Sequence, residues 1–179
     1  LMCLERVIKL SDDIAVRYAA LVHDVGKAAT DQSKWPSHSG HEALGIALQD
    51  QIAKRLRIPN EHNQLAALVC EHHTKLHRIQ QLQPIALLNL LESLDAFRRP
   101  ERLEKFLLVC EAVVPGRIGF EDQEYPQRDY LNAVLAATRD LNFATLLAEK
   151  GKGNAAEAVK NRRLQLVTDK VAELSTSND

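Results

Sequence analysis

Apolar residues recur along most of this chain at the spacing of three and four residues that amphipathic helices show. Segments rich in Pro, Gly, Ser and Asp interrupt the pattern, as expected of the connections between helices. No segment alternates apolar and polar residues in the manner of a strand, so we predict an all-α fold. The helices are predicted over residues 1–10, 13–25, 41–56, 61–76, 84–95, 100–112, 128–141 and 154–174.

The clearest interruption in the second half of the chain lies between Val114 and Pro126, where Pro and Gly residues are frequent. We therefore predict a helical domain over residues 1–112, a linker loop over 113–126 and a smaller helical extension over 127–179. An earlier irregular stretch, from Gly26 to Gly40, is predicted to be a loop beside the first domain's functional site.

The composition is that of an ordinary globular protein, with 45% hydrophobic residues, 26% charged residues and a formal net charge of -1. The three cysteines are scattered, which indicates neither a disulfide framework nor a thiolate zinc site and fits a reducing cytoplasm. No apolar run approaches the roughly 18 residues that span a bilayer, so we expect a cytoplasmic protein with no membrane contact. Because Leu1 falls within a helical pattern, we also expect the chain to be part of a longer protein.

The first candidate for chemistry is an adjacent pair, His23 and Asp24, at the end of an apolar helical segment. Neighbouring side chains on a helix point about 100° apart, so both can reach one ion only where the helix ends. Gly26 is predicted to end it there. Taken alone, the pair fits a solvated helix end better than a metal site.

Further metal-capable side chains lie at predicted helix ends downstream. Asp95 follows a Leu-rich stripe in the last turn of a helix, where the helix dipole disfavours an acidic side chain and a cation would compensate for it. His41 opens one helix, and His72 and His73 lie late in another. Each could ligate an ion or contact a phosphate, and each could equally be a cap or a surface residue. Imidazole and carboxylate ligands are those that catalytic metal sites acting on phosphate require.

Positively charged residues supply two candidate phosphate contacts. Lys27 lies beside the His-Asp pair and could steady a phosphate oxygen, although a loop lysine is commonly only solvated. The last predicted helix is locally basic and suits the phosphate backbone of a nucleic acid, with a solvated amphipathic face as the alternative. The basic residues in this helix and just before it are Lys150, Lys152, Lys160, Arg162, Arg163 and Lys170. Of these, Lys160, Arg162 and Arg163 are the leading candidates. The remaining histidines, His38, His62 and His77, are expected to face solvent.

Five strings together closely resemble the C-terminal half of the bacterial multifunctional CCA proteins, the tRNA nucleotidyltransferases that carry an HD domain. The resemblance covers essentially the whole chain, and the later strings are specific to that family. The strings are LVHDVGK (21–27), KWPSHSGHE (34–42), EHHT (71–74), LDAFRRPER (94–102) and GFEDQEYPQ (119–127).

This resemblance implies an HD-type helical domain with metal-dependent 2′,3′-cyclic phosphodiesterase, 2′-nucleotidase and phosphatase activity, which often favours Ni²⁺ or another transition ion. It implies that His23, Asp24 and Asp95 are metal ligands and that His41 and His73 are accessory catalytic residues. Its implied partners are tRNA and 2′,3′-cyclic or 2′-phosphorylated nucleotides, and the protein would be a monomer or homodimer. The polymerising head of that family, which uses Mg²⁺, has no counterpart in this chain.

One departure from the HD pattern concerns the ligand set. The pattern begins with a further His one helix earlier, and residues 1–22 contain none, so that ligand would fall just before Leu1. Two alternatives to an active phosphohydrolase therefore stay open. One is a helical module that binds tRNA and whose His-Asp pair is silent, and the other is a stand-alone HD hydrolase of free nucleotides.

Overall fold

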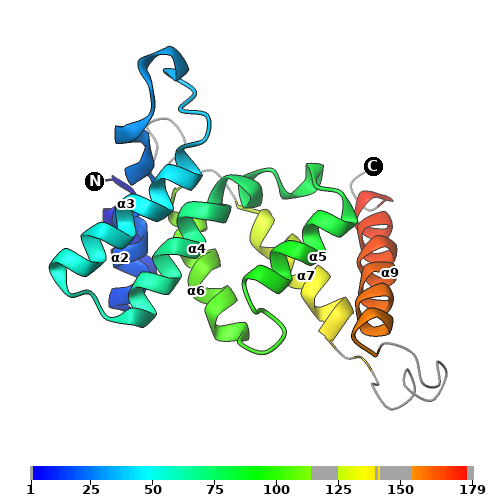
Figure 1. Ribbon diagram of the computed structural model, residues 1–179. Coiled ribbons are helices and arrows are strands. Elements are labelled where there is room, and N and C mark those ends of the chain that lie inside the picture. The colour runs from blue at the N-terminus through cyan, green and yellow to red at the C-terminus, as the bar shows by residue number, and fades with distance from the viewer. Residues whose placement is uncertain (1, 114–124, 140, 142–154, 177–179) are drawn as a thin grey trace. The chain divides into compact units, whose positions relative to one another are not determined.

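Helices make up the whole of the regular structure in the computed structural model, which describes residues 2–113, 125–139, 141 and 155–176. No strand occurs among these residues, so the predicted all-α fold is confirmed. The α-helices are α1 (Met2–Leu10), α2 (Ile14–Val22), α3 (His41–Leu56), α4 (Asn60–His77), α5 (Pro84–Ser93), α6 (Pro100–Val113), α7 (Gln127–Arg139) and α9 (Ala155–Thr176) (Figure 1). Three short 3₁₀ helices are η1 (Val25–Ala29), η2 (Gln32–Lys34) and η3 (Ile79–Gln81).

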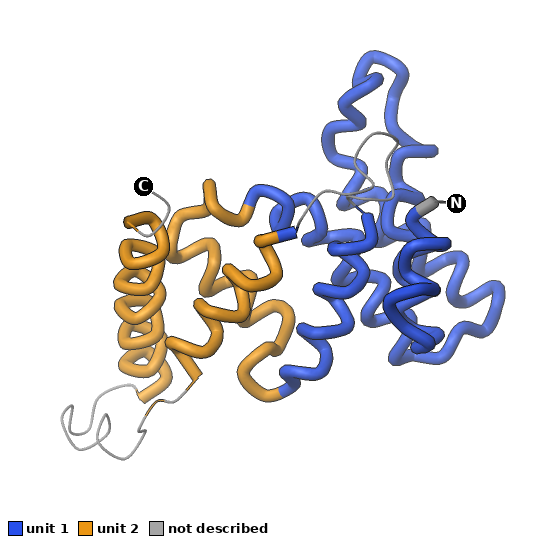
Figure 2. Tube along the Cα trace, turned by 180° about the vertical axis from the view of Figure 1, so that it is seen from behind, with its two compact units in different colours: residues 1–78, 99–125 blue, residues 79–98, 126–179 orange. Residues whose placement is uncertain are grey.

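Contacts between these helices divide the chain into two compact units (Figure 2). Unit 1 contains residues 1–78 and 99–125, and unit 2 contains residues 79–98 and 126–179. The contacts thus group α5 with the C-terminal helices. The predicted functional division at 113–126 stays a prediction, because residues 114–124 lie outside the described part of the chain.

Unit 1 is built around α2, which packs against α1, α4 and α6. Helix α2 can occupy this position because it is apolar on most sides, and its residues Val16 and Ala19 are fully buried. Helix α3 covers α4 and also contacts η1. Residues 25–40, with η1 and η2, project from these helices at the top of Figure 1. The predicted loop over this stretch therefore contains two short 3₁₀ helices.

The described helices of unit 2 are η3, α5, α7 and α9, with α9 packed against both α5 and α7. Pro84 is at the start of α5, where its missing N–H costs no hydrogen bond. The buried side chains are the Leu stripe of α5, the apolar face of α7 and two residues of α9, Ala158 and Val167. They include Leu87, Leu88, Leu91, Leu131, Val134 and Val167, each fully buried.

No helix in the described part of the chain combines the length and the apolar character needed to cross a membrane.

The start of α2 is fixed by a side-chain cap, Asp13. The Asp13 carboxylate accepts hydrogen bonds from the backbone N–H groups of Ala15 (2.7 Å) and Val16 (3.3 Å). It also pairs with Lys105 of α6, at 2.9 Å. Burial raises the pKa of Asp13, but Lys105 and the two N–H groups together lower it by more than burial raises it, so the net shift is downward. The cap therefore joins local helix formation to the packing of α6 on α2.

Replacing Asp13 by Ala should lower the free energy of unfolding by about 1 kcal/mol near neutral pH, because two N–H groups lose their acceptor. The folded pKa of Asp13 is depressed, so its contribution is present above the unfolded value of about 3.9 and is lost as the pH falls through the lower folded value. Urea unfolding at neutral and acidic pH measures both effects. Asp12→Ala is the control, since that exposed neighbour only pairs with Arg17. Equal destabilisation by the two substitutions would contradict the capping role.

Candidate metal centre

The His-Asp pair lies in the turn between α2 and η1. Helix α2 ends at Val22, and His23 and Asp24 follow it before η1 begins at Val25. The predicted helix to Val25, with Gly26 as its stop, is therefore wrong in detail. Among the described glycines, only Gly40 has a positive φ, whereas Gly26 lies within η1.

Gly26 has a packing role instead, because η1 lies directly on the first turns of α3. A Cβ atom at Gly26 would overlap the carbonyl oxygen of His41 and would lie only 2.5 Å from the backbone nitrogen of Gly45. Both neighbours are backbone atoms of α3, which a rotamer change cannot move. The missing side chain therefore lets the chain bring Asp24 and the start of α3 together.

Three ligand atoms meet at this point, one each from Asp24, His41 and His73, all within 4.8 Å of one another. Oδ1 of Asp24 is 3.2 Å from Nε2 of His41 and 3.5 Å from Nε2 of His73. The other carboxylate oxygen, Oδ2, is 3.2 Å from Nε2 of His23. His41 and His73 are buried, with 6% and 2% of their surface exposed. The turn after α2, the start of α3 and the late part of α4 thus each contribute a side chain.

The backbone determines which nitrogen of each ring faces the carboxylate. Nδ1 lies 2.8 Å from the carbonyl oxygen of Ala20 in the case of His23, and 2.8 Å from that of Val69 in the case of His73. Nδ1 of His41 lies 3.1 Å from the carbonyl oxygen of His38. A carbonyl oxygen can only accept, so each Nδ1 carries the hydrogen and donates it. In the neutral rings, all three Nε2 lone pairs are therefore directed toward one carboxylate.

Two of these facing atoms lack a hydrogen bond. Nε2 of His41 and Oδ1 of Asp24 are buried and have no hydrogen-bonding partner, although they lie 3.2 Å apart. Protonation of all three Nε2 atoms would place three imidazolium charges beside Lys27 around a single carboxylate. A cation between the lone pairs and the carboxylate satisfies the same atoms without that repulsion. Backbone acceptors on the far side of ligating rings are the usual support of such a site, so these residues fit a divalent metal ion.

Lys27 carries the positive charge that pairs with the Asp24 carboxylate. Its Nζ atom donates to Oδ2 of Asp24 at 2.6 Å, and its side chain is 36% exposed. Burial raises the pKa of Asp24, but the rings of His23 and His73, in the protonated form that donates to its oxygens, and the Lys27 ammonium group outweigh it and hold that pKa well below its usual range. Asp24 is therefore a carboxylate throughout the physiological pH range.

The structure separates the two histidines that the sequence left as a pair. Nδ1 of His72 lies 3.2 Å from the ammonium group of Lys75, and Nε2 of His72 is 3.7 Å from Glu71, so this ring is not in the cluster. Burial lowers the pKa of His72, the Glu71 carboxylate raises it by less, and the Lys75 ammonium group lowers it, so the net shift is downward. Of the two, only His73 has its ring in the cluster.

Asp95 belongs to unit 2, whereas the clustered residues belong to unit 1. It follows α5 with a φ of 54° and accepts two hydrogen bonds from Arg98, at 2.7 and 2.9 Å. Its role as a metal ligand stays a prediction.

The basic residues of α9 are partly engaged within unit 2. Lys160 lies 3.9 Å from Glu92, and the Arg163 guanidinium group stacks 3.6 Å from the centre of the Phe97 ring. Arg162 is exposed. Lys150 and Lys152 lie outside the described residues.

Two further contacts support the cluster and were not predicted. Glu42 accepts a hydrogen bond from the Thr74 hydroxyl group at 2.9 Å, which joins α3 to α4 one residue from each ligand histidine. His77, which was expected to face solvent, instead has its Nδ1 atom 3.1 Å from the Tyr125 hydroxyl oxygen and its ring against His73. The i, i+4 spacing of His73 and His77 on one helix was the available signal for the second contact.

Comparison with known proteins places this arrangement in a family. A family model described as the HD domain matches residues 1–109, which include His23, Asp24, His41 and His73. The chain belongs to the HD domain family. With the Asp and His cluster, this membership indicates a divalent metal ion in the site.

Curated relatives of this HD domain are proteins named multifunctional CCA protein. The one from Thioalkalivibrio sulfidiphilus (strain HL-EbGR7) is 45% identical over 174 residues, covering 97% of this chain and 42% of the relative. Those from Hahella chejuensis (strain KCTC 2396) and Psychromonas ingrahamii (strain DSM 17664 / CCUG 51855 / 37) are 42% and 40% identical, covering 93% of this chain and 40% and 41% of theirs. The chain thus spans about two fifths of the length of these relatives. No solved structure matches it.

The close approach at Gly26 gives a direct test of how the HD domain positions its ligands. Gly26→Ala should lower the free energy of unfolding by about 2 kcal/mol or more, because the added methyl group meets backbone that cannot yield. It should also weaken metal binding by displacing His41 from Asp24. Urea unfolding and isothermal titration with a divalent ion measure the two effects.

Gly45→Ala is the matched control on the facing helix. Its Cβ atom would meet Cys70 at 3.5 Å, an ordinary contact, and alanine favours the helix. This variant should change stability by no more than about 1 kcal/mol and should leave metal affinity unaltered. If Gly26→Ala behaves like Gly45→Ala, the proposed constraint is wrong.

Proposed function

We propose that this HD domain is a metal-dependent phosphohydrolase acting on phosphate esters of nucleotides, as part of a longer tRNA-processing protein related to the multifunctional CCA proteins. The observation that carries the proposal is the set of three Nε2 atoms directed at the Asp24 carboxylate. The membership in the HD domain family supports the same chemistry.

The proposed ligands are Asp24, His41 and His73, with His23 beside them on the second carboxylate oxygen. Because the donor set is rich in imidazole, it suits Ni²⁺ or another transition ion better than Mg²⁺. Since each ring uses Nδ1 to donate to the backbone, we assign His41 and His73 to metal binding rather than to protonation of the leaving group. The variant Asp95→Asn tests whether Asp95 is a further metal ligand. Its affinity for Ni²⁺, measured by titration, should then be lower than that of the original chain.

The proposed substrates are 2′,3′-cyclic and 2′-phosphorylated nucleotides. When bound, the ion would supply positive charge for the phosphoryl oxygens and lower the pKa of a water molecule. Lys27 donates one ammonium hydrogen to Asp24 and has two more that can be offered to a phosphoryl oxygen. The same lysine thereby holds the carboxylate in position and adds to the anion-binding charge at the exposed side of the cluster.

Asp24→Asn provides the main test, because it keeps the shape of the side chain while removing the charge that the three rings face. Bound metal should be lost, and hydrolysis of 2′,3′-cyclic nucleotides should fall by at least about a hundredfold. Metal content by mass spectrometry and phosphate release, with and without added Ni²⁺, are the measurements. Asp50→Asn is the control and should keep both properties, because this half-buried carboxylate on α3 pairs with Lys54 and Asn63 and is not part of the cluster.

The comparison should be made in this chain and in a longer one that includes the N-terminal part present in the relatives. Retention of metal and of phosphodiesterase activity by Asp24→Asn in the longer chain would show that the site assignment is wrong. A stand-alone hydrolase of free nucleotides predicts equal activity of the two chains.

A second candidate function is tRNA binding through α9, for which the structure favours one residue over its neighbour. Arg162 is exposed, whereas Arg163 is stacked on Phe97. Arg162→Ala should weaken tRNA binding and reduce the slope of affinity against salt by about one, with stability unchanged. Arg163→Ala should mainly lower stability, by about 1 kcal/mol. Fluorescence anisotropy with tRNA and thermal unfolding measure the two. Unchanged affinity and salt slope in Arg162→Ala would remove α9 as the contact.

A further inference from the structure

The segment between Asp24 and His41 carries an aromatic side chain that is largely open to solvent. Both ends of the segment are proposed metal ligands, so residues 25–40 extend directly from the cluster and project from the helices in Figure 1. Trp35, the only tryptophan in the chain, follows η2 in this segment and has 57% of its surface exposed. An exposed indole ring is typical of surfaces that bind a ligand or partner, where tryptophan is enriched.

The backbone around Trp35 is held by hydrogen bonds on both sides of it. The N–H group of Trp35 donates to the carbonyl oxygen of Gln32 at 3.1 Å. The carbonyl oxygen of Lys34 accepts the N–H of His38 at 2.8 Å and the Ser37 hydroxyl group at 2.9 Å, which closes a turn around the tryptophan. A ligand therefore meets an indole ring on an ordered backbone, so binding removes little conformational freedom.

A chain of contacts joins this turn to the cluster. The centres of the Trp35 and His38 rings lie 5.9 Å apart. Nδ1 of His38 is 2.6 Å from the hydroxyl oxygen of Thr30, and that hydroxyl group donates to the carbonyl oxygen of Lys27 at 2.9 Å. Because a hydroxyl group has one hydrogen, Nδ1 of His38 is the donor to Thr30. Lys27 pairs with Asp24, so the position of Trp35 is connected to the carboxylate.

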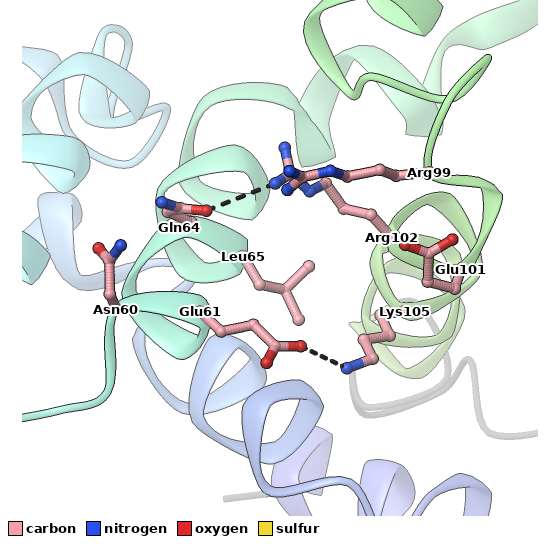
Figure 3. A pocket seen from close by; sticks show the side chains of 8 residues that line it. All are labelled: Asn60, Glu61, Gln64, Leu65, Arg99, Glu101, Arg102 and Lys105. Carbon is pink, nitrogen blue, oxygen red and sulfur yellow. Dashed lines mark hydrogen bonds and ion pairs between the residues drawn. The ribbon is translucent and has the colours of Figure 1, made fainter.

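The pocket found in unit 1 has no comparable aromatic surface. It measures about 340 Å³ and lies between the first turns of α4 and α6 (Figure 3). None of the side chains that line it is aromatic, and Lys105 donates to Glu61 across it at 2.9 Å. This pocket therefore offers polar and charged groups, but no plane on which a nucleobase could stack.

Nucleobases commonly bind proteins by stacking on aromatic rings, a contact open to every base because each has a π face. The phosphate and the base of a nucleotide are joined through one ribose. A nucleotide whose phosphate lies at the Asp24 cluster therefore places its base in the surroundings of that cluster. As an extension of the phosphohydrolase function proposed above, and resting on it, we propose that Trp35 stacks on the base of the nucleotide substrate. Such a contact selects nucleotides over other phosphate esters and discriminates little among the bases.

Because Trp35 is the only tryptophan, its fluorescence reports directly on this contact in the unaltered chain. The emission is recorded while adenosine 2′-phosphate is added, first with EDTA and then with Zn²⁺. Ribose 2-phosphate, which has the same phosphate group without a base, is the matched control ligand. The same additions to N-acetyltryptophanamide correct for light that the nucleotide absorbs.

Adenosine 2′-phosphate should quench the Trp35 emission in a saturable manner, whereas ribose 2-phosphate should leave it unchanged. Absence of saturable quenching both with EDTA and with Zn²⁺ would overturn the proposal, and so would equal quenching by the two ligands. An emission that changes when the protein is diluted, with no effect of the nucleotide, would assign Trp35 to a contact between two copies of the chain and would equally overturn it.

Kinetics of the metal-loaded chain give a second readout. Trp35→Ala should raise the KM for 2′,3′-cyclic AMP by about tenfold or more, with kcat nearly unchanged, because the stacking contact is equally strong before and during the reaction. Trp35→Phe keeps an aromatic plane and should restore most of the affinity. Hydrolysis of glycerol 1,2-cyclic phosphate, which has no base, should be the same in all three chains. Leu56→Ala is the control variant, since Leu56 is 60% exposed at the far end of α3.

The two readouts separate this proposal from the phosphohydrolase function. Hydrolysis of 2′,3′-cyclic AMP with an unaltered KM in Trp35→Ala would overturn the stacking contact and leave the function in place. Base-dependent quenching in a chain that hydrolyses no phosphate ester would support the stacking contact and contradict the function. Thermal unfolding shows whether Trp35→Ala is folded, and the fluorescence measurement decides without any substitution.

Discussion

The Asp24 carboxylate is the point on which the architecture of unit 1 converges. Asp24 lies in the turn after α2. Its carboxylate faces His41 at the start of α3 and His73 late in α4, and it forms an ion pair with Lys27 of η1. The facing imidazole lone pairs and carboxylate oxygens are a stable arrangement only if positive charge lies among them, which Lys27 supplies on one carboxylate oxygen and a divalent cation would supply at the ligand atoms. The glycine at position 26 allows the backbone contact that brings α3 close enough. The apolar helices determine the fold, and this contact determines where the ligands meet.

The orientation of the rings explains why these histidines differ from the others. Three of them donate Nδ1–H to a carbonyl oxygen three or four residues earlier, so each ring is fixed by the stretch of backbone directly before it. A ring fixed in this way loses little conformational entropy when it binds an ion. His72, one residue from a ligand, lies beside Lys75 instead. Helix geometry alone therefore separates a ligand from its neighbour.

Much of the fold was predictable because apolar periodicity and Pro or Gly breaks are local signals. The predicted ends of α3, α4 and α6 agree with the structure to within about one residue. The His-Asp pair, His41 and His73 were identified as candidates, but their distances from one another depend on long-range packing. The role of Gly26 could not be predicted because it depends on backbone 15 to 19 residues away. The partners of Arg163 and His77 were missed for the same reason, since Phe97 and Tyr125 lie far along the chain.

The measurement that tests this account most directly is the ¹⁵N spectrum of the histidine rings, recorded without metal and then with Zn²⁺, a diamagnetic ion. The rings of His23, His41 and His73 should each carry a hydrogen on Nδ1, which faces a backbone carbonyl oxygen. Zn²⁺ should shift the Nε2 resonances of His41 and His73 while leaving His62 unchanged. Detection of the Nε2–H tautomer in these rings, or Nε2 resonances that do not respond to the ion, would contradict a metal centre at Asp24.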